Sequence, residues 1–157
     1  MAKSAKQRKL ERDNRAWRRD LIEEAGHCQL PDCPGEWPHL LTVHEIACGH
    51  GGRSLAYSRR LAVLVACWHC NSERLTDYTI WPIERQAALQ CVLCEDIATV
   101  QQVLECINFC RGRAPTAISA PSLDLGNYFT EFGKVLFTDR AGECSLIDAT
   151  EADHEPK

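Results

Sequence analysis

Residues 61–71 read LAVLVACWHCN, an apolar run that ends in the closely spaced pair Cys67 and Cys70. The run is short and rich in branched apolar side chains, which favours a buried strand. The polar residues from Asn71 onward indicate a helix that begins near the second cysteine. This stretch therefore predicts a strand that presents two thiols at the start of a helix.

A second pair of cysteines, Cys28 and Cys33, lies upstream of this stretch. Residues 27–38 (HCQLPDCPGEWP) are dense in Pro, Gly and Asp, which is typical of a tight loop. Tetrahedral zinc takes four soft ligands, and a pair of cysteines on a turn presents two sulfurs to the metal from one side. We expect the two pairs to hold one structural zinc ion.

Two other interpretations of these cysteines are open. Free cysteine packs as a small hydrophobic residue, so the four thiols can belong to a small core. Cys67 and Cys70 also have the spacing of a thioredoxin-like redox pair. Such a pair opens a helix after a central strand of a larger βαβ sheet, which the flanking sequence does not supply.

The segment between the two pairs predicts a β-hairpin. Residues 40–46 (LLTVHEI) favour a first strand, and residues 47–60 form a broad loop with three Gly and three Arg. Residues 61–66 return as the second strand. We expect residues 27–82 to form one zinc-bound unit.

Helices are predicted on both sides of this unit. Residues 1–26 contain a basic helix that ends at Gly26, and residues 83–112 hold two helical patterns that form a hairpin. Residues 113–157 turn to Pro, Ser, Gly and acids, which indicates a flexible acidic tail. The expected fold class is α+β, with a small zinc-bound core between the basic helix and the helical hairpin.

Charge is distributed unevenly along the chain. The formal net charge is -4, yet residues 1–20 carry eight Lys or Arg against three acids, and residues 121–157 carry eight acids against three bases. A local basic surface is compatible with nucleic-acid binding despite the acidic total. The polar N-terminus and the lack of a long apolar segment predict a cytoplasmic protein without a membrane span. In that reducing compartment, paired cysteines bind metal more often than they form disulfides.

The order of these features resembles the zinc-stabilised HNH, or ββα-metal, nucleases of phages and bacteria. The resemblance rests on the two cysteine pairs, on residues 43–46 (VHEI) and on residues 67–71 (CWHCN), and it covers about a third of the chain, residues 27–80. It implies a treble-clef zinc core. It also implies a DNA endonuclease or nickase in the cytoplasm of a bacterium or of a phage-infected host.

The resemblance further implies roles for three residues. In the family, the strand dipeptide supplies a metal ligand and then a general-base His, and the residue after the last cysteine supplies a second ligand. By position, His44 corresponds to the first metal ligand, Glu45 to the general base and Asn71 to the second metal ligand. His44 and Asn71 would thus bind a catalytic Mg²⁺ or similar ion, which stabilises charge on the phosphate while the base activates water. No small-molecule cofactor is indicated.

The register of the strand dipeptide is open. A carboxylate is a poorer proton acceptor at pH 7 than an imidazole. A shift of one residue would make His44 the base and leave Glu45 and Asn71 to the ion. Arg59 and its neighbours occupy the place of the middle Asn of the family pattern. His44 can also be a partly buried, hydrogen-bonded histidine without a catalytic role.

DNA is the expected partner. The basic side chains of the N-terminal helix and of the hairpin loop are expected to contact phosphates. These side chains are Arg8, Lys9, Arg12, Arg15, Arg18, Arg19, Arg53, Arg59 and Arg60. Two competing interpretations are a non-catalytic zinc-containing nucleic-acid-binding module with a degenerate HNH site, and a zinc module for protein interaction.

Four further cysteines lie in the predicted helical hairpin. Cys91 and Cys94 have i,i+3 spacing, and Cys106 and Cys110 have i,i+4 spacing, so each pair lies on one face of a helix. Across the hairpin, the two pairs can meet around a second zinc ion. The alternative is that they are thiols packed on the inward faces of the helices.

Overall fold

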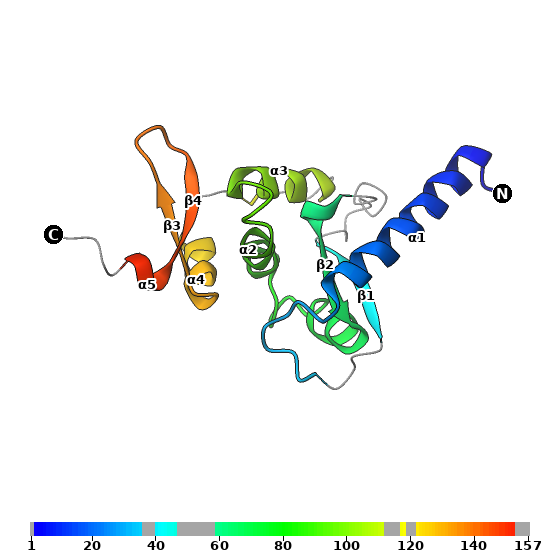
Figure 1. Ribbon diagram of the computed structural model, residues 1–157, viewed down its shortest axis with the longest axis horizontal. Coiled ribbons are helices and arrows are strands. Elements are labelled where there is room, and N and C mark those ends of the chain that lie inside the picture. Colours follow the sequence, from blue (N-terminus) through cyan, green and yellow to red (C-terminus); the bar gives the residue numbers. More distant parts are fainter. Residues whose placement is uncertain (1, 36–39, 47–58, 112–116, 119–121, 153–157) are drawn as a thin grey trace.

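The computed structural model describes residues 2–35, 40–46, 59–111, 117–118 and 122–152. These residues form helices and two small antiparallel sheets, which confirms the α+β class (Figure 1). Within them, no helix combines the length and the apolar character needed to cross a bilayer.

An antiparallel hairpin of β1 (Leu41–Glu45) and β2 (Val63–Cys67) lies at the centre of the fold. Every residue of β2 is buried, as expected for an unbroken apolar strand that is covered on both faces. In this register, His44 of β1 pairs with Leu64 of the buried strand β2. The short 3₁₀ helix η3 (Arg60–Ala62) leads into β2, and the π-helical turn η4 (Cys70–Arg74) follows it.

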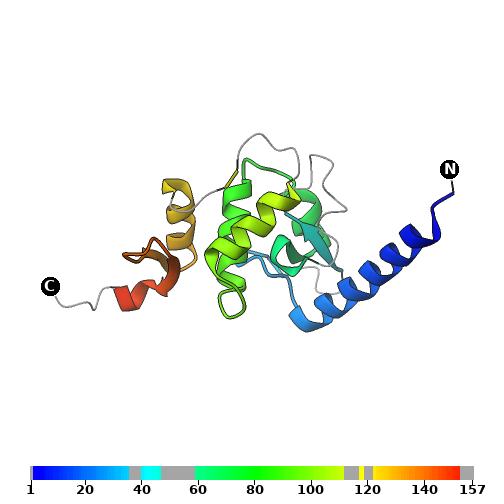
Figure 2. The ribbon, with the colours of Figure 1, turned by 90° about the horizontal axis from the view of Figure 1, so that it is seen from above.

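Helix α1 (Ala5–Ala25) packs its second half against the hairpin. Ser4 caps its start by accepting a hydrogen bond from the Gln7 N–H, and Gly26 ends it in the left-handed conformation, at a φ of 69°. Leu21 is buried against the core, whereas the first turns of the helix extend away from the rest of the chain (Figures 1 and 2).

Helices α2 (Ile83–Leu93) and α3 (Val100–Cys110) pack against each other beside the hairpin (Figure 2). A capping box starts α3, because the Thr99 hydroxyl accepts from the Gln102 N–H and the Gln102 side chain accepts from the Thr99 N–H. Most of α2 is buried, including the polar side chains of Gln86 and Gln90.

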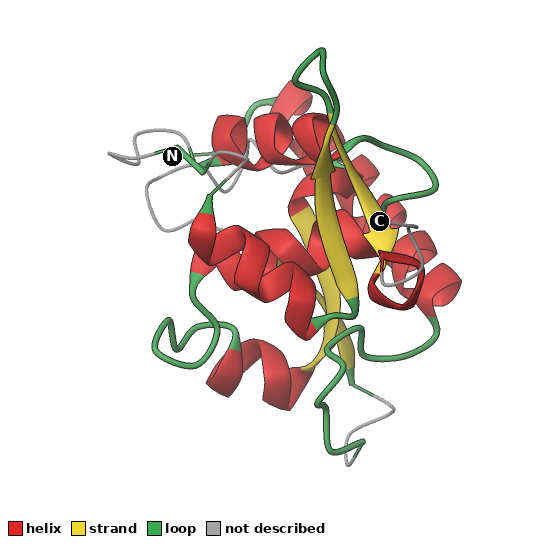
Figure 3. Cartoon of the chain, turned by 90° about the vertical axis from the view of Figure 1, so that its left-hand side faces the viewer, coloured by secondary structure: helices red, strands yellow, loops and turns green. Residues whose placement is uncertain are grey.

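The structure differs from the sequence-based expectation in the C-terminal part. Where residues 113–157 predict a flexible tail, the chain forms α4 (Leu123–Glu131), β3 (Lys134–Thr138), β4 (Cys144–Asp148) and the single turn α5 (Ala149–Ala152). Strands β3 and β4 form the second hairpin, which Figure 3 shows beside the helices.

Apolar residues at helical spacing attach this C-terminal part to the core. Leu125 and Phe129 are fully buried where α4 packs against α2. The Phe132 ring stacks on Trp81 with centroids 6.1 Å apart, and Arg85 pairs with Glu131 across the same contact. The acidic average composition of the segment masks these few apolar positions.

Candidate metal centre

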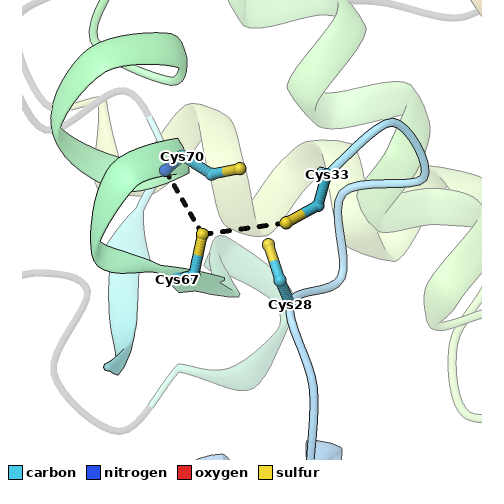
Figure 4. Close-up of side chains that lie close together, drawn as sticks. All are labelled: Cys28, Cys33, Cys67 and Cys70. Carbon is cyan, nitrogen blue, oxygen red and sulfur yellow. Dashed lines mark hydrogen bonds between the residues drawn. The ribbon is translucent and has the colours of Figure 1, made fainter. Parts of the chain in front are cut away.

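Four cysteine side chains converge at the end of β2, namely those of Cys28, Cys33, Cys67 and Cys70 (Figure 4). Their Sγ atoms all lie within 4.8 Å of one another, and those of Cys33 and Cys67 are 3.7 Å apart. A tetrahedron of sulfurs about 2.3 Å from a zinc ion has edges of about 3.8 Å. The cluster predicted from the sequence is therefore present and is compatible with structural zinc.

Hydrogen bonds between Gln29 and Val65 hold the loop of the first cysteine pair against β2. The Gln29 N–H donates to the Val65 carbonyl at 2.9 Å, and the Val65 N–H donates to Gln29 Oε1 at 2.7 Å. This reciprocal pair attaches the Cys28 loop to β2. The Trp68 N–H donates to the Leu40 carbonyl, which extends the hairpin up to the second pair.

The thiols of the cluster differ in their acidity. Burial and the neighbouring thiols raise the pKa of Cys70. Burial also raises the pKa of Cys28. Desolvation also acts on Cys67, but hydrogen bonds from the Cys70 N–H and from the surrounding thiols outweigh it and lower its pKa. Crowded, part-buried thiols resist becoming thiolates together unless a cation compensates their charge, so the donor set suits a divalent metal.

Arg74 connects the two halves of the cluster. Its guanidinium donates to the Asp32 carbonyl at 3.2 Å, pairs with the Asp32 carboxylate and lies 3.7 Å from Cys70 Sγ. The pKa of Arg74 is raised, because these hydrogen bonds outweigh its desolvation. A positive charge beside the Cys70 sulfur favours the ionised form of that thiol.

A second polar group lies on the other side of the hairpin, around His44. The His44 Nδ1 atom is 3.0 Å from Asn71 Oδ1, and Asn71 Nδ2 donates to Thr42 Oγ1 at 2.7 Å. Thr42 and His44 come from β1, whereas Asn71 comes from η4. The structure thus brings together the two residues that the resemblance marks as ligands of a catalytic ion.

Gln86 contacts the opposite edge of the His44 ring, with Gln86 Oε1 2.9 Å from His44 Nε2. Burial lowers the pKa of His44, although its contacts with Gln86 and Asn71 act in the other direction. The imidazole is therefore neutral at pH 7. Gln86 belongs to α2, outside the predicted zinc-bound unit, and its only sequence signal is a glutamine among the apolar residues of a helix.

Glu45, which the resemblance marks as the general base, faces α1 rather than His44 and Asn71. Its carboxylate forms an ion pair with the Arg18 guanidinium, and both side chains are mostly buried. Arg18 therefore neutralises Glu45, and this pair connects α1 to β1.

The other basic residues expected to bind DNA divide into three groups. Arg60 forms an ion pair with Glu24 at 2.8 Å, and Arg59 stacks over the Phe109 ring at 4.5 Å. Arg53 lies outside the described residues. The remaining side chains, all exposed on α1, are Arg8, Lys9, Arg12, Arg15 and Arg19.

Four of these α1 residues form what we call the arginine stripe: Arg8, Arg12, Arg15 and Arg19. At 100° and 1.5 Å per residue, they lie within about 60° of one another around the helix and span about 16 Å. Leu21, on the opposite face, packs against the hairpin. Arg18 lies between the two faces and contacts Glu45.

The four cysteines of the helical hairpin are buried or half-buried, but no three of them form a group of metal ligands. Burial raises the pKa of Cys91 to about 12 and also raises that of Cys94 and Cys106. In the part of the chain that the structure describes, the four-cysteine cluster at β2 is the only group of three or more His, Cys, Asp or Glu within ligand distance. The predicted second zinc site is therefore not assembled.

Comparisons with known protein families, with curated proteins and with solved structures find no match for this chain.

Proposed function

We propose that this chain is an HNH-like, metal-dependent endonuclease or nickase that hydrolyses phosphodiester bonds in DNA. The observation that carries the proposal is the 3.0 Å approach of His44 Nδ1 to Asn71 Oδ1. The two residues are far apart in the sequence, and they occupy the positions at which the HNH resemblance implies ligands of a catalytic ion.

The separation of these two atoms suits a shared hard cation. In an octahedral site with ligands about 2.1 Å from Mg²⁺, neighbouring ligand atoms are about 3.0 Å apart. Asn71 Nδ2 donates to Thr42 Oγ1, which leaves Asn71 Oδ1 turned toward His44. His44 and Asn71 would hold Mg²⁺ or a similar ion, which when bound supplies positive charge for the scissile phosphate.

The cysteine cluster has a structural part in this proposal. Cys67 ends β2, and Cys70 opens the turn that carries Asn71. A zinc ion bound by both would fix the direction in which η4 leaves the hairpin, and with it the distance from Asn71 to His44. We propose that this arrangement is a treble-clef, ββα-metal core.

The arginine stripe supports DNA as the substrate. Like charges three and four residues apart destabilise a helix by themselves, so four of them on one face favour a polyanionic partner. Phosphates along the stripe would supply a sequence-independent, salt-sensitive part of the binding energy. Arg18 serves a different role, because it is paired with Glu45.

The same ion pair favours a second candidate function. A carboxylate that is held by a guanidinium is stabilised in its charged form and is a poor proton acceptor. Glu45 is therefore a weak base at the position where the family has imidazole. The second candidate is a non-catalytic zinc-containing module that binds nucleic acid through the same scaffold.

A plasmid assay separates the two candidates. Zinc-loaded protein is incubated with supercoiled DNA in Mg²⁺, Mn²⁺ or EDTA, together with the variants His44→Ala and His69→Ala. His69 is the matched control, because it lies in the same region but pairs with Glu73. We expect nicked or linear DNA with Mg²⁺ or Mn²⁺, lost in EDTA and with His44→Ala, and kept with His69→Ala. Retarded DNA without cutting in any metal would reject the enzyme and support the binding module. No DNA binding at low salt would reject both.

A further inference from the structure

The Gln86 side chain joins the His44 group from outside the segment that resembles HNH nucleases. Gln86 lies on α2 and is fully buried. Its Nε2 group donates to the carbonyl oxygens of Leu75, at 2.9 Å, and of Trp81, at 2.8 Å. Its Oε1 atom faces His44 Nε2 at 2.9 Å. All the polar atoms of this amide therefore have a partner.

The two carbonyl oxygens fix the orientation of the Gln86 amide. A carbonyl oxygen only accepts hydrogen bonds, so the NH₂ group must face Leu75 and Trp81. A half-turn of the amide would place Oε1 against both carbonyls and leave buried acceptors without donors. Because Oε1 also only accepts, the His44 Nε2 atom must carry a proton.

A proton on Nε2 determines the state of the other ring nitrogen. A neutral imidazole has one N–H, so Nδ1 keeps its lone pair, and Nδ1 is the atom beside Asn71. With an ion, the Nδ1 and Oδ1 lone pairs can share it. Without an ion, a half-turn of the Asn71 amide lets Nδ2 donate to Nδ1 while Thr42 Oγ1 donates to Oδ1.

We propose that Gln86 is a positioning residue that holds His44 in the Nε2–H tautomer and thereby presents Nδ1 to the divalent ion. The step from the tautomer to the ion rests on the proposed function. In this arrangement His44 is a ligand rather than a mobile base, because its second nitrogen is engaged by a buried amide that cannot turn.

Nitrogen-15 NMR of the histidine side chains tests the tautomer directly. The spectra are recorded at pH 8 on zinc-loaded protein without added Mg²⁺, and the His44 signals are assigned from their loss in His44→Ala. We expect the pattern of the Nε2–H tautomer in the unmodified protein. The pattern of the Nδ1–H tautomer, or of a doubly protonated ring at this pH, would overturn the proposal whether or not a Gln86 variant folds.

Two glutamine variants test the role of Gln86. Gln86→Met keeps the length of the side chain and removes its acceptor and donors, so we expect the His44 pattern to shift to a mixture of tautomers. Gln90→Met is the matched control, because Gln90 is buried on the same helix and donates to the Arg60 carbonyl instead. An unchanged His44 pattern in a folded Gln86→Met protein, or an equal change in Gln90→Met, would overturn the proposal.

Titration with Mn²⁺ keeps this proposal separate from the proposed function. We expect Mn²⁺ to broaden the His44 signals of the unmodified protein at lower concentration than those of Gln86→Met. If the tautomer depends on Gln86 but Mn²⁺ broadens neither protein, the positioning role is supported and the metal-dependent activity is rejected.

Discussion

Zinc binding by the four-cysteine cluster should tighten steeply as the pH rises. Thiols have pKa values of about 8.5, so at pH 7 they are mostly protonated and must lose their protons to the solvent when they bind a metal. Burial raises the pKa of Cys28 and Cys70, which keeps both thiols protonated to higher pH in the metal-free protein. The lowered pKa of Cys67 works in the opposite direction for one thiol.

The expected size of the effect follows from the number of protons. If each of the four thiols releases one proton, the apparent affinity rises about 10⁴-fold per pH unit, or about 5 kcal/mol. If Cys67 is already a thiolate before binding, the rise is about 10³-fold. We therefore expect about three to four protons released per zinc ion at neutral pH, and weaker binding as the pH falls.

Competition with a chromophoric zinc chelator between pH 6.5 and 7.5 measures this slope, and calorimetry in buffers of different ionisation enthalpy counts the protons. Cys70→Ser removes one ligand and should lower both the affinity and the proton count. Cys144→Ser, on β4 and away from the cluster, should change neither. A slope of one proton or fewer, or an equal effect of the two variants, would refute a four-thiolate site.

Two further predictions concern the C-terminal part and the arginine stripe. Phe129→Ala should lower the free energy of unfolding by about 3 to 5 kcal/mol, because it opens a cavity where α4 packs. Phe137→Ala should lower it far less, since Phe137 is 50% exposed. Urea titrations that give equal losses for the two variants would show that α4 does not pack on the core. Arg12→Ala should reduce the slope of log affinity for DNA against log salt concentration by about 1. Arg140→Ala, in the exposed turn between β3 and β4, should leave that slope unchanged. Equal slopes for the two variants would show that the arginine stripe does not contact DNA.

The four-cysteine cluster was predictable from the sequence because its constraint is local. Each cysteine pair lies on a short turn, so spacing alone shows that both sulfurs point the same way. The contact between His44 and Asn71 was accessible only through the family resemblance, because nothing in either local sequence says that a strand residue meets a residue of the following turn.

The partners of His44 and Glu45 were not predictable, since they come from other elements. Gln86 and Arg18 occupy ordinary positions on helices, where a glutamine or an arginine usually faces the solvent. Their roles depend on how α2 and α1 pack against the hairpin, and that packing is determined by apolar residues such as Leu21 rather than by the polar residues themselves. The folded C-terminal part was missed for a related reason, because its few buried apolar side chains are diluted by acids.

His44 is therefore contacted from two sides, by Asn71 of the turn after β2 and by Gln86 of α2, and different interactions hold these two parts of the chain in place. The cysteine cluster leads through the turn that follows β2 to Asn71, and its four crowded thiols are compatible with a metal ion such as zinc. Gln86 comes from α2, which is held in place by the core and by α4. A fragment that ended at residue 82 would keep all four cysteines, His44 and Asn71, yet it would lose the amide that fixes the His44 tautomer. If Gln86 acts as we propose, Gln86→Met in the full chain would leave zinc binding by the four cysteines unchanged but weaken Mn²⁺ binding at His44, and the functional unit would extend beyond the segment that carries the family resemblance.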